Sequence, residues 1–105
     1  VASKDGGMVG ALIKDPAQQH VIMFSADPNG APPTGSIIYE VGANAPSLHN
    51  LFDLRPSTGY RIDVARSERD YVITVAAGGD RMTTAAGVLS FELEAEPDAA
   101  PVASR

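Results

Sequence analysis

The sequence predicts an all-β domain, an antiparallel β-sandwich of about seven or eight short strands. Ten Gly and eight Pro residues are spread along the 105-residue chain. They separate short runs rich in Val, Ile, Tyr and Phe, which is the pattern of strands divided by turns. No stretch carries the 3.6-residue apolar periodicity of a helix of normal length. Strands that recur about every ten residues favour a two-layer sandwich.

The N-terminal half contains four of the expected strands, and turn residues separate them. Asp15-Pro16 ends the first and could open at most one helical turn. A loop at 26–35 ends the second and holds a tight-turn Asp-Pro-Asn-Gly at 27–30. The break at 42–46 ends the third. These four strands are expected at residues 8–14, 20–25, 36–41 and 47–54.

The fifth expected strand, residues 60–66, has the clearest period-two alternation. Tyr60, Ile62 and Val64 share one face, and the residues between them are Arg, Asp and Ala. One face should therefore be buried and the other solvated. We assign Tyr60 to the core, together with Phe24 and Phe91.

The C-terminal half continues with a charged turn at 67–70 and a strand at 71–76. Gly78-Gly79 then predicts a hairpin that returns residues 81–84 against that strand. The last strand is expected at 88–93, where apolar residues alternate with Ser and Glu.

The two ends of the chain differ in composition from the rest. Residues 1–7 are small and polar, and residues 94–105 are acidic, rich in Ala and Pro, and without periodicity. Such segments bury too little apolar surface to offset the entropy of ordering. We expect a β-sandwich domain at 8–93, with a flexible N-terminus at 1–7 and a disordered tail at 94–105.

Charge and composition argue against several classes of partner. Eight Lys and Arg against thirteen Asp and Glu give a net charge of −5, which disfavours nucleic acid and anionic membranes. The absence of Cys excludes a disulfide scaffold, thiolate zinc and Cys nucleophiles. No apolar run approaches the roughly 20 residues of a bilayer span, so no membrane span is expected.

Side chains suited to catalysis are sparse. The two histidines, His20 and His49, lie outside the known catalytic and metal-binding motifs, so we expect both to be exposed or capped. The acidic residues fall mostly in turns and in the tail, with no pair indicated across a cleft. We therefore expect no catalytic residue, metal or cofactor, and a small enzyme is the least favoured function.

Residues 54–64 carry a specific pattern of alternating residues. It resembles the Leu-x-Pro-x-Thr-x-Tyr-x-Val-x-Val stretch of fibronectin type III domains, and its members here are Leu54, Pro56, Thr58, Tyr60, Ile62 and Val64. The resemblance implies an Ig or fibronectin type III-like β-sandwich. It also implies a structural corner, formed by the first four of these residues. In that corner Pro56 stiffens a crossing between the sheets, and the Tyr60 hydroxyl bonds a backbone group a few residues upstream. The chain lacks the buried Trp usual in those domains, which indicates a relative of the family.

A second resemblance joins two other segments. The string at 83–91, following the string at 49–56, is similar to the β-sandwich modules of secreted bacterial polysaccharide-degrading enzymes, such as heparinase-like lyases. This implies a non-catalytic accessory module, extracellular or periplasmic, that spaces, stabilises or docks a neighbouring domain. The partner would be that domain of the same polypeptide or another protein.

A ligand-binding module is the alternative function. Sugar-binding modules present exposed aromatic rings, and Tyr39 and Tyr71 are the candidates here, although we favour cross-strand packing as the role of both rings. Among the arginines, Arg61, Arg66 and Arg69 cluster in sequence and form the best basic patch. Carbohydrate or protein contacts would use these five residues.

Overall fold

The computed structural model describes residues 3–4, 7–15, 17–33 and 35–96. These residues form eight strands and no helix, so the predicted all-β class is confirmed. β4 and β7 end earlier than the sequence pattern suggested. The strands are β1 (Met8–Lys14), β2 (Gln19–Ser25), β3 (Ile37–Gly42), β4 (Ser47–Leu51), β5 (Gly59–Ser67), β6 (Asp70–Ala77), β7 (Arg81–Met82) and β8 (Leu89–Leu93).

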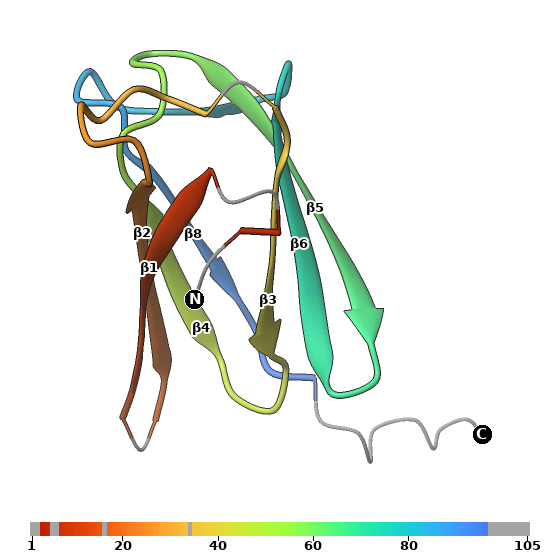
Figure 1. Ribbon diagram of the computed structural model, residues 1–105. Coiled ribbons are helices and arrows are strands. Elements are labelled where there is room, and N and C mark those ends of the chain that lie inside the picture. The colour runs from red at the N-terminus through yellow and green to blue at the C-terminus, as the bar shows by residue number, and fades with distance from the viewer. Residues whose placement is uncertain (1–2, 5–6, 16, 34, 97–105) are drawn as a thin grey trace.

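The strands make two sheets that face each other as layers (Figure 1). The first sheet has the order β1-β2-β4-β8 and the second β3-β6-β5-β7. All neighbours are antiparallel except β2 and β4, which run parallel. The expected return of residues 81–84 against β6 is wrong. Because β6 is already flanked by β3 and β5, the short β7 pairs with β5 instead.

The core lies between the layers and takes alternate residues from both sheets. The first sheet contributes Val21, Met23 and Leu51, among others, and the second contributes Ile73 and Val75. This burial of one face per strand is the driving force that holds the layers together.

Two residues that were expected in the core are exposed. Side chains alternate between the two faces of β2. Phe24 is 44% exposed because it lies on the face opposite to that of Val21 and Met23. Val64 is 41% exposed although it shares a side with the buried Tyr60. Because β7 pairs only with Gly59 and Tyr60, the rest of β5 is a sheet edge with little cover.

The chain crosses from the first sheet to the second at residues 52–58, and Tyr60 anchors this corner. The Tyr60 ring is buried, and its hydroxyl accepts a hydrogen bond of 3.1 Å from the Arg55 N–H. Leu54 is buried beneath the crossing, while Pro56 lies on the surface. The Thr58 hydroxyl donates to the Pro56 carbonyl at 2.8 Å. This is the contact pattern of a tyrosine corner.

The segment before β8 braces the corner from the other side. The buried Thr83 hydroxyl donates to the Arg55 carbonyl at 2.5 Å and accepts from the Thr58 N–H at 2.9 Å. The Leu54 N–H donates to the Gly87 carbonyl at 3.0 Å. Gly87 has φ 81, and a Cβ there would overlap the Leu54 carbonyl oxygen, so only Gly fits this approach. The two sequence strings at 49–56 and 83–91 thus meet in space.

The described parts of both chain ends are bonded to the sheets. The Ser3 N–H donates to the Met8 carbonyl at 2.9 Å, and the Lys4 N–H donates to the Ile38 carbonyl at 2.8 Å. Near the other end, the Tyr71 hydroxyl donates to the Glu94 carbonyl at 2.7 Å. Most of the predicted flexible N-terminus and disordered tail, residues 1–2, 5–6 and 97–105, lies outside the described residues.

The corner predicts a graded response at Tyr60. Tyr60→Phe keeps the ring and loses the acceptor for Arg55, so it should cost about 1 kcal/mol of the free energy of unfolding. Tyr60→Ala also removes the buried ring and should cost about 3–5 kcal/mol. Urea unfolding measures both, with Val64→Ala as a control expected to cost under about 1 kcal/mol. A midpoint that Tyr60→Ala leaves unchanged contradicts the role of the corner.

Candidate functional site

The outer face of the first sheet carries a contiguous apolar surface. The register places Val9 beside Phe24 and Ala11 beside Ile22 on the side away from the core. Phe52 continues the outward parity of β4, and its N–H donates to the Met23 carbonyl at 2.7 Å. We define the β1–β2 face as Val9, Ala11, Ile13, Ile22, Phe24, Leu48 and Phe52.

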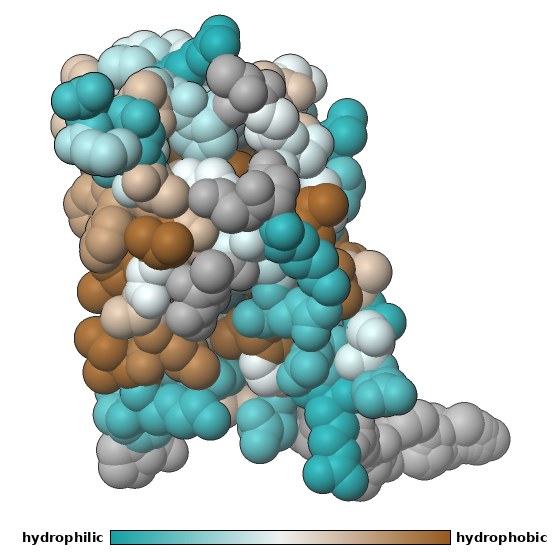
Figure 2. Space-filling view, viewed as in Figure 1, coloured by the Kyte–Doolittle hydropathy of each residue, from teal (hydrophilic) through white to brown (hydrophobic). Residues whose placement is uncertain are grey.

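No member of the β1–β2 face is charged, and four of its large side chains are among the most exposed apolar groups of the described chain. Two polar residues lie on the same side of the sheet: His20 between Ile13 and Leu48, and Asn50 beside Ile22. Figure 2 shows hydrophobic atoms gathered over β1 and β2, with hydrophilic atoms below them. Exposed apolar groups that gather in one patch mark a contact surface, whereas scattered single ones do not.

The outer face of the second sheet differs in kind. It presents polar and charged side chains between apolar ones such as Ile38 and Val72. Ion pairs join Lys4 to Glu40 and Arg61 to Asp63, each at 2.9 Å. On β8, Ser90 and Glu92 border the apolar face, and the Ser90 hydroxyl donates to Asn50 at 2.6 Å. The apolar surface is therefore a feature of one side of the molecule.

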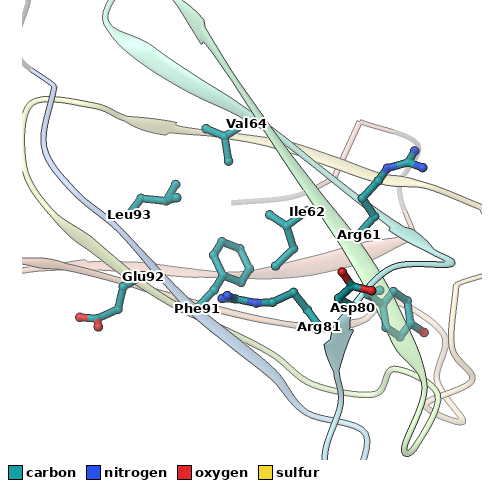
Figure 3. A pocket seen from close by; sticks show the side chains of 9 residues that line it. Arg61, Ile62, Val64, Asp80, Arg81, Phe91, Glu92 and Leu93 are labelled. Atoms are coloured by element: carbon teal, nitrogen blue, oxygen red, sulfur yellow. The ribbon is translucent and has the colours of Figure 1, made fainter.

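A groove of about 420 Å³ opens between the edges of β5 and β8. In Figure 3 Ile62, Phe91 and Arg81 point into the same space, while Glu92 points away from it. The apolar lining continues through the exposed Val64 to Leu93. The groove has an apolar floor, and its lining includes the charged residues Arg61, Asp80 and Arg81, of which Arg81 is directed between Ile62 and Phe91. It has no convergent set of polar groups that would orient a small ligand.

A chain of hydrogen bonds crosses the core between the two sheets. The Tyr39 hydroxyl lies 2.7 Å from His49 Nδ1, and His49 Nε2 lies 2.8 Å from Ser47 Oγ. The imidazole also stacks on Phe91 of the neighbouring β8, with the ring centres 4.5 Å apart. Both ring nitrogens therefore have a partner, one as donor and one as acceptor.

The hydrogen-bonded chain of Ser47, His49 and Tyr39 resembles a nucleophile with its base. Because all three residues are buried, we assign this chain to the core. His49 is 0% exposed, so the expectation of an exposed or capped histidine at this position is wrong. Burial lowers the pKa of His49 to about 4 and raises the pKa of the Tyr39 hydroxyl. The neutral imidazole is thus a fixed structural connector that no substrate reaches.

Neither tyrosine proposed for ligand contact is exposed. Tyr39 is 1% and Tyr71 is 6% exposed, because both have the inward parity of their strands. Tyr39 lies opposite Ile73 and Tyr71 opposite Val41 in the β3–β6 register, so both pack across strands. Neither ring can act as a platform for a sugar.

The three arginines of the predicted basic patch separate. Arg61 projects from the outer face of the second sheet, where it pairs with Asp63. Arg66 has the opposite parity, and with Arg69 it lies at the far end of the β5–β6 hairpin, where both line a pocket with Lys14. No local sequence pattern points to Lys14, which joins the two arginines only through the packing of the turns.

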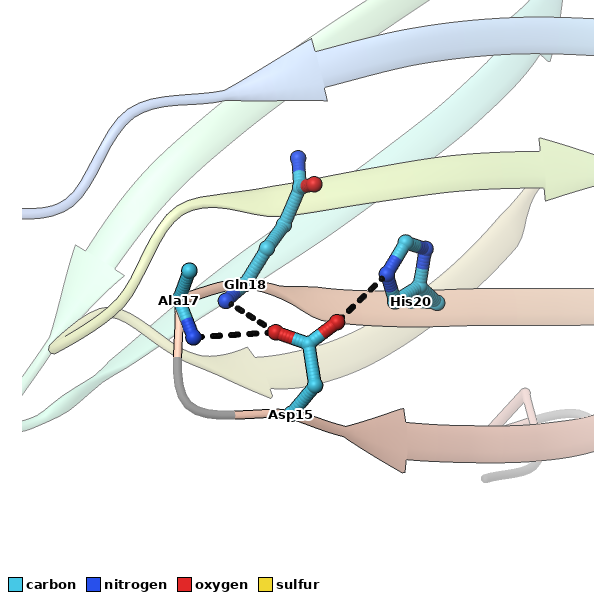
Figure 4. A network of polar contacts seen from close by, with 4 residues as sticks. All are labelled: Asp15, Ala17, Gln18 and His20. Carbon is cyan, nitrogen blue, oxygen red and sulfur yellow. Dashed lines mark hydrogen bonds and ion pairs between the residues drawn. The ribbon is translucent and has the colours of Figure 1, made fainter.

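His20 is partly exposed and lies on β2 next to the β1–β2 turn (Figure 4). Asp15 accepts hydrogen bonds from the N–H groups of Ala17 and Gln18 at 2.9 and 2.8 Å, and its other oxygen lies 3.1 Å from His20 Nε2. These two backbone donors, and then His20, lower the pKa of Asp15. All the partners of this carboxylate are local, so it caps a turn.

Comparison with family models, curated proteins and solved structures found no match to the chain. Within the described residues, no group of three His, Asp or Glu side chains is placed to hold a metal ion. The same residues include no helix with the length and apolar character to cross a bilayer. The β1–β2 face is the surface of this structure best suited to contact another molecule.

The buried imidazole predicts a pH dependence of stability. The pKa of an unfolded histidine is about 6.5. Between pH 6.5 and 4, His49 therefore binds a proton in the unfolded chain and stays neutral in the folded one. The contribution of His49 should be complete above pH 6.5 and be lost as the pH falls to about 4, on the order of 3 kcal/mol in total. Urea unfolding from pH 4 to 7 measures this slope.

The matched pair of histidines supplies the control. His49→Phe should remove most of the slope between pH 6.5 and 4, whatever it does to stability at pH 7. His20→Gln should keep the part of the slope that His49 causes, because it leaves the buried His49 imidazole in place. Equal slopes in the wild type and His49→Phe would show that this imidazole does not control acid stability.

Proposed function

We propose that this chain is a non-catalytic accessory module that spaces, stabilises or docks a neighbouring domain. The β1–β2 face is the contact surface, and the partner is a domain of the same polypeptide or another protein. The observation that carries the proposal is the contiguous, uncharged apolar patch on the outside of one sheet, opposite a polar outer face on the other.

The energetics favour contact through this face. Burial of apolar surface is worth about 25 cal/mol per Å², and Phe24, Phe52, Ile13 and Val9 are all between 39% and 51% exposed. The side chains stand on paired strands, so docking would order few groups that are not already ordered. A face built in this way suits a fixed neighbour better than a small soluble ligand.

The sequence resemblance supports the rest of the proposal. The hydrogen bond from Arg55 to the Tyr60 hydroxyl supports kinship with Ig and fibronectin type III-like modules. In an immunoglobulin sheet the strand after the corner lies between its two partners in the order C-F-G, whereas here β3 pairs with β6 and not with β5. We therefore propose a relative of those modules, beside a polysaccharide-degrading domain in an extracellular or periplasmic enzyme.

Carbohydrate binding through Tyr39, Tyr71 and the arginines has less support. Both rings are in the core, and Arg61 is separated from Arg66 and Arg69. The exposed aromatic rings among the described residues are those of Phe24 and Phe52, which belong to the β1–β2 face and not to the predicted sugar-contact residues. The apolar face is accordingly the stronger basis for a function.

Hydroxyl-radical footprinting tests the proposed docking. In the polypeptide that carries the neighbouring domain, Phe24 and Phe52 should be oxidised severalfold more slowly than in the isolated chain, because docking buries their rings. Met82 is 60% exposed and lies in the other sheet, so its oxidation should not change. Equal oxidation of both Phe residues in the two samples would overturn the β1–β2 face as the contact.

A substitution in the β1–β2 face is a second test of the proposed docking. A buried large apolar side chain contributes about 1.5–3 kcal/mol, so Phe24→Lys should weaken docking by about tenfold or more. The same change should leave the stability of the isolated chain within about 0.5 kcal/mol, because the side chain points to solvent. Arg81→Gln, outside the face, should leave docking unchanged.

A further inference from the structure

The second sheet has an open edge along most of β5, which is its outermost long strand in Figure 1. β7 pairs only with Gly59 and Tyr60. From Arg61 to Ser67, β5 has no neighbour on that side among the described residues. On its other side the pairing of β5 with β6 is continuous and contains no bulge. The edge is therefore regular enough to receive another strand.

One hydrogen bond shows which backbone groups of β5 face the open edge. The Gly59 carbonyl accepts from the Gly78 N–H at 2.9 Å, on the side of β6. Successive residues of a strand direct their N–H and C=O groups to alternate sides, so Ile62 and Val64 direct theirs away from β6. On that side, no hydrogen bond joins these groups to the part of the chain that the structure describes.

The opposite side of the sandwich is covered by the chain itself. The edge strands there are β1 and β3. Ser3 bonds to the start of β1, and Lys4 bonds to β3. Soluble proteins usually protect an edge in this way, or with Lys, Pro, a bulge or a charge that points inward. Between Ile62 and Val64 the β5 edge has none of these devices.

The groove beside this edge has room for the side chains of an added strand. It has a volume of about 420 Å³, with Ile62 and Val64 on the β5 side and Phe91 and Leu93 on the β8 side. Val64 is 41% exposed and Leu93 is partly exposed, so apolar surface remains to be covered. Because every second side chain of a strand points to the same face, apolar residues at alternate positions suit this groove.

Arg81 indicates the chemistry expected at one end of the added strand. Figure 3 shows its guanidinium directed between Ile62 and Phe91. Within the described residues this side chain has no ion pair or hydrogen bond, not even with Asp80, which lines the same groove. β7 runs antiparallel to β5, so a strand that continues the line of β7 ends beside Arg81. A carboxylate at that end would pair with the guanidinium.

We propose that the β5 edge binds an extended segment of a partner protein, with apolar side chains at alternate positions and a carboxylate at its C-terminal end. The segment runs antiparallel to β5, and its backbone pairs with Ile62 and Val64. Its apolar side chains cover Phe91 and Leu93, and its carboxylate meets Arg81. In such strand addition the main-chain bonds give affinity and the alternate side chains give specificity. The site is independent of the docking role proposed for the β1–β2 face.

Amide hydrogen exchange followed by NMR tests the pairing. In the free chain the N–H groups of Ile62 and Val64 should exchange fast, and those of Arg61 and Asp63, which face β6, should exchange slowly. The probe is a short peptide of alternating Val and Thr with a C-terminal Glu. It should slow exchange at Ile62 and Val64 at least severalfold and leave Arg61 and Asp63 unchanged.

Two results of this experiment would overturn the proposal. The same peptide with methylated backbone nitrogens cannot donate hydrogen bonds to β5, so it should have no effect. Equal protection by both peptides would show that the backbone does not pair. Protection of Ile62 and Val64 that rises with the concentration of the free chain would show that a second copy, and not a partner segment, covers the edge.

Substitutions assign the binding to this edge. Val64→Lys places a charge on the side of β5 that faces the groove and should weaken binding of the Glu peptide at least severalfold. Val9 is exposed to nearly the same extent, 39% against 41%, so Val9→Lys on the β1–β2 face is the matched control and should bind like the wild type. A Val64→Lys chain that keeps its ¹⁵N spectrum and its affinity for the peptide would refute the site.

A change at the end of the peptide tests the role of Arg81. A peptide that ends in Gln should bind the wild type severalfold more weakly than the Glu peptide does. The Arg81→Gln variant should bind the two peptides alike, because it lacks the guanidinium. A preference for Glu that persists in this variant would refute the pairing of Arg81 with the carboxylate.

Discussion

The hydrogen bond between the Tyr39 hydroxyl and the His49 imidazole fixes how the two sheets meet. Tyr39 belongs to β3 and His49 to β4, so the bond joins one layer to the other in the middle of the core. A buried polar group left without its partner costs about 1–3 kcal/mol. A slip of β4 by one residue would turn His49 outward and leave the Tyr39 hydroxyl buried and unpaired. The network therefore specifies the register as well as contributing to stability.

That register also decides what the outside of the first sheet presents. With His49 and Leu51 inward, Leu48 must face out on β4, and pairing then places Ile22 and Phe24 outward on β2. The same alternation that builds the core thus gathers apolar groups on the opposite face. At the other end, the turns that close β1–β2, β3–β4 and β5–β6 bring Lys14, Arg66 and Arg69 together. The register of the first sheet therefore determines its apolar face, whereas the turns determine the cluster of cations.

The sequence predicted the strands well, because Gly and Pro mark their ends and period-two alternation marks their bodies. It could not say which neighbour a strand takes, so the pairing of Arg81 and Met82 with β5 was missed. The alternation of side chains along a strand defines two faces and does not say which one is covered. For this reason Phe24 was wrongly assigned to the core, and exposure remained an alternative for Tyr39 and Tyr71. Val64 shows a further limit: its side of β5 faces inward, but β5 is a sheet edge with little cover at this position, because β7 pairs only with Gly59 and Tyr60. The cluster of Lys14 with Arg66 and Arg69 depends on turns distant in sequence, for which no local pattern exists.

The parallel pairing of β2 with β4 constrains the order in which the chain can acquire its structure. The β1–β2 and β5–β6 hairpins are local and can form early, on the microsecond scale typical of hairpins. β2 and β4 are separated in sequence by β3, which belongs to the other layer, so their ladder closes only after the chain has crossed and returned. Loop closure of this kind is an entropic barrier, and topologies rich in such distant pairings fold slowly. Until the β2–β4 ladder forms, the apolar side chains on both faces of β2 are exposed to water and to other partly folded chains.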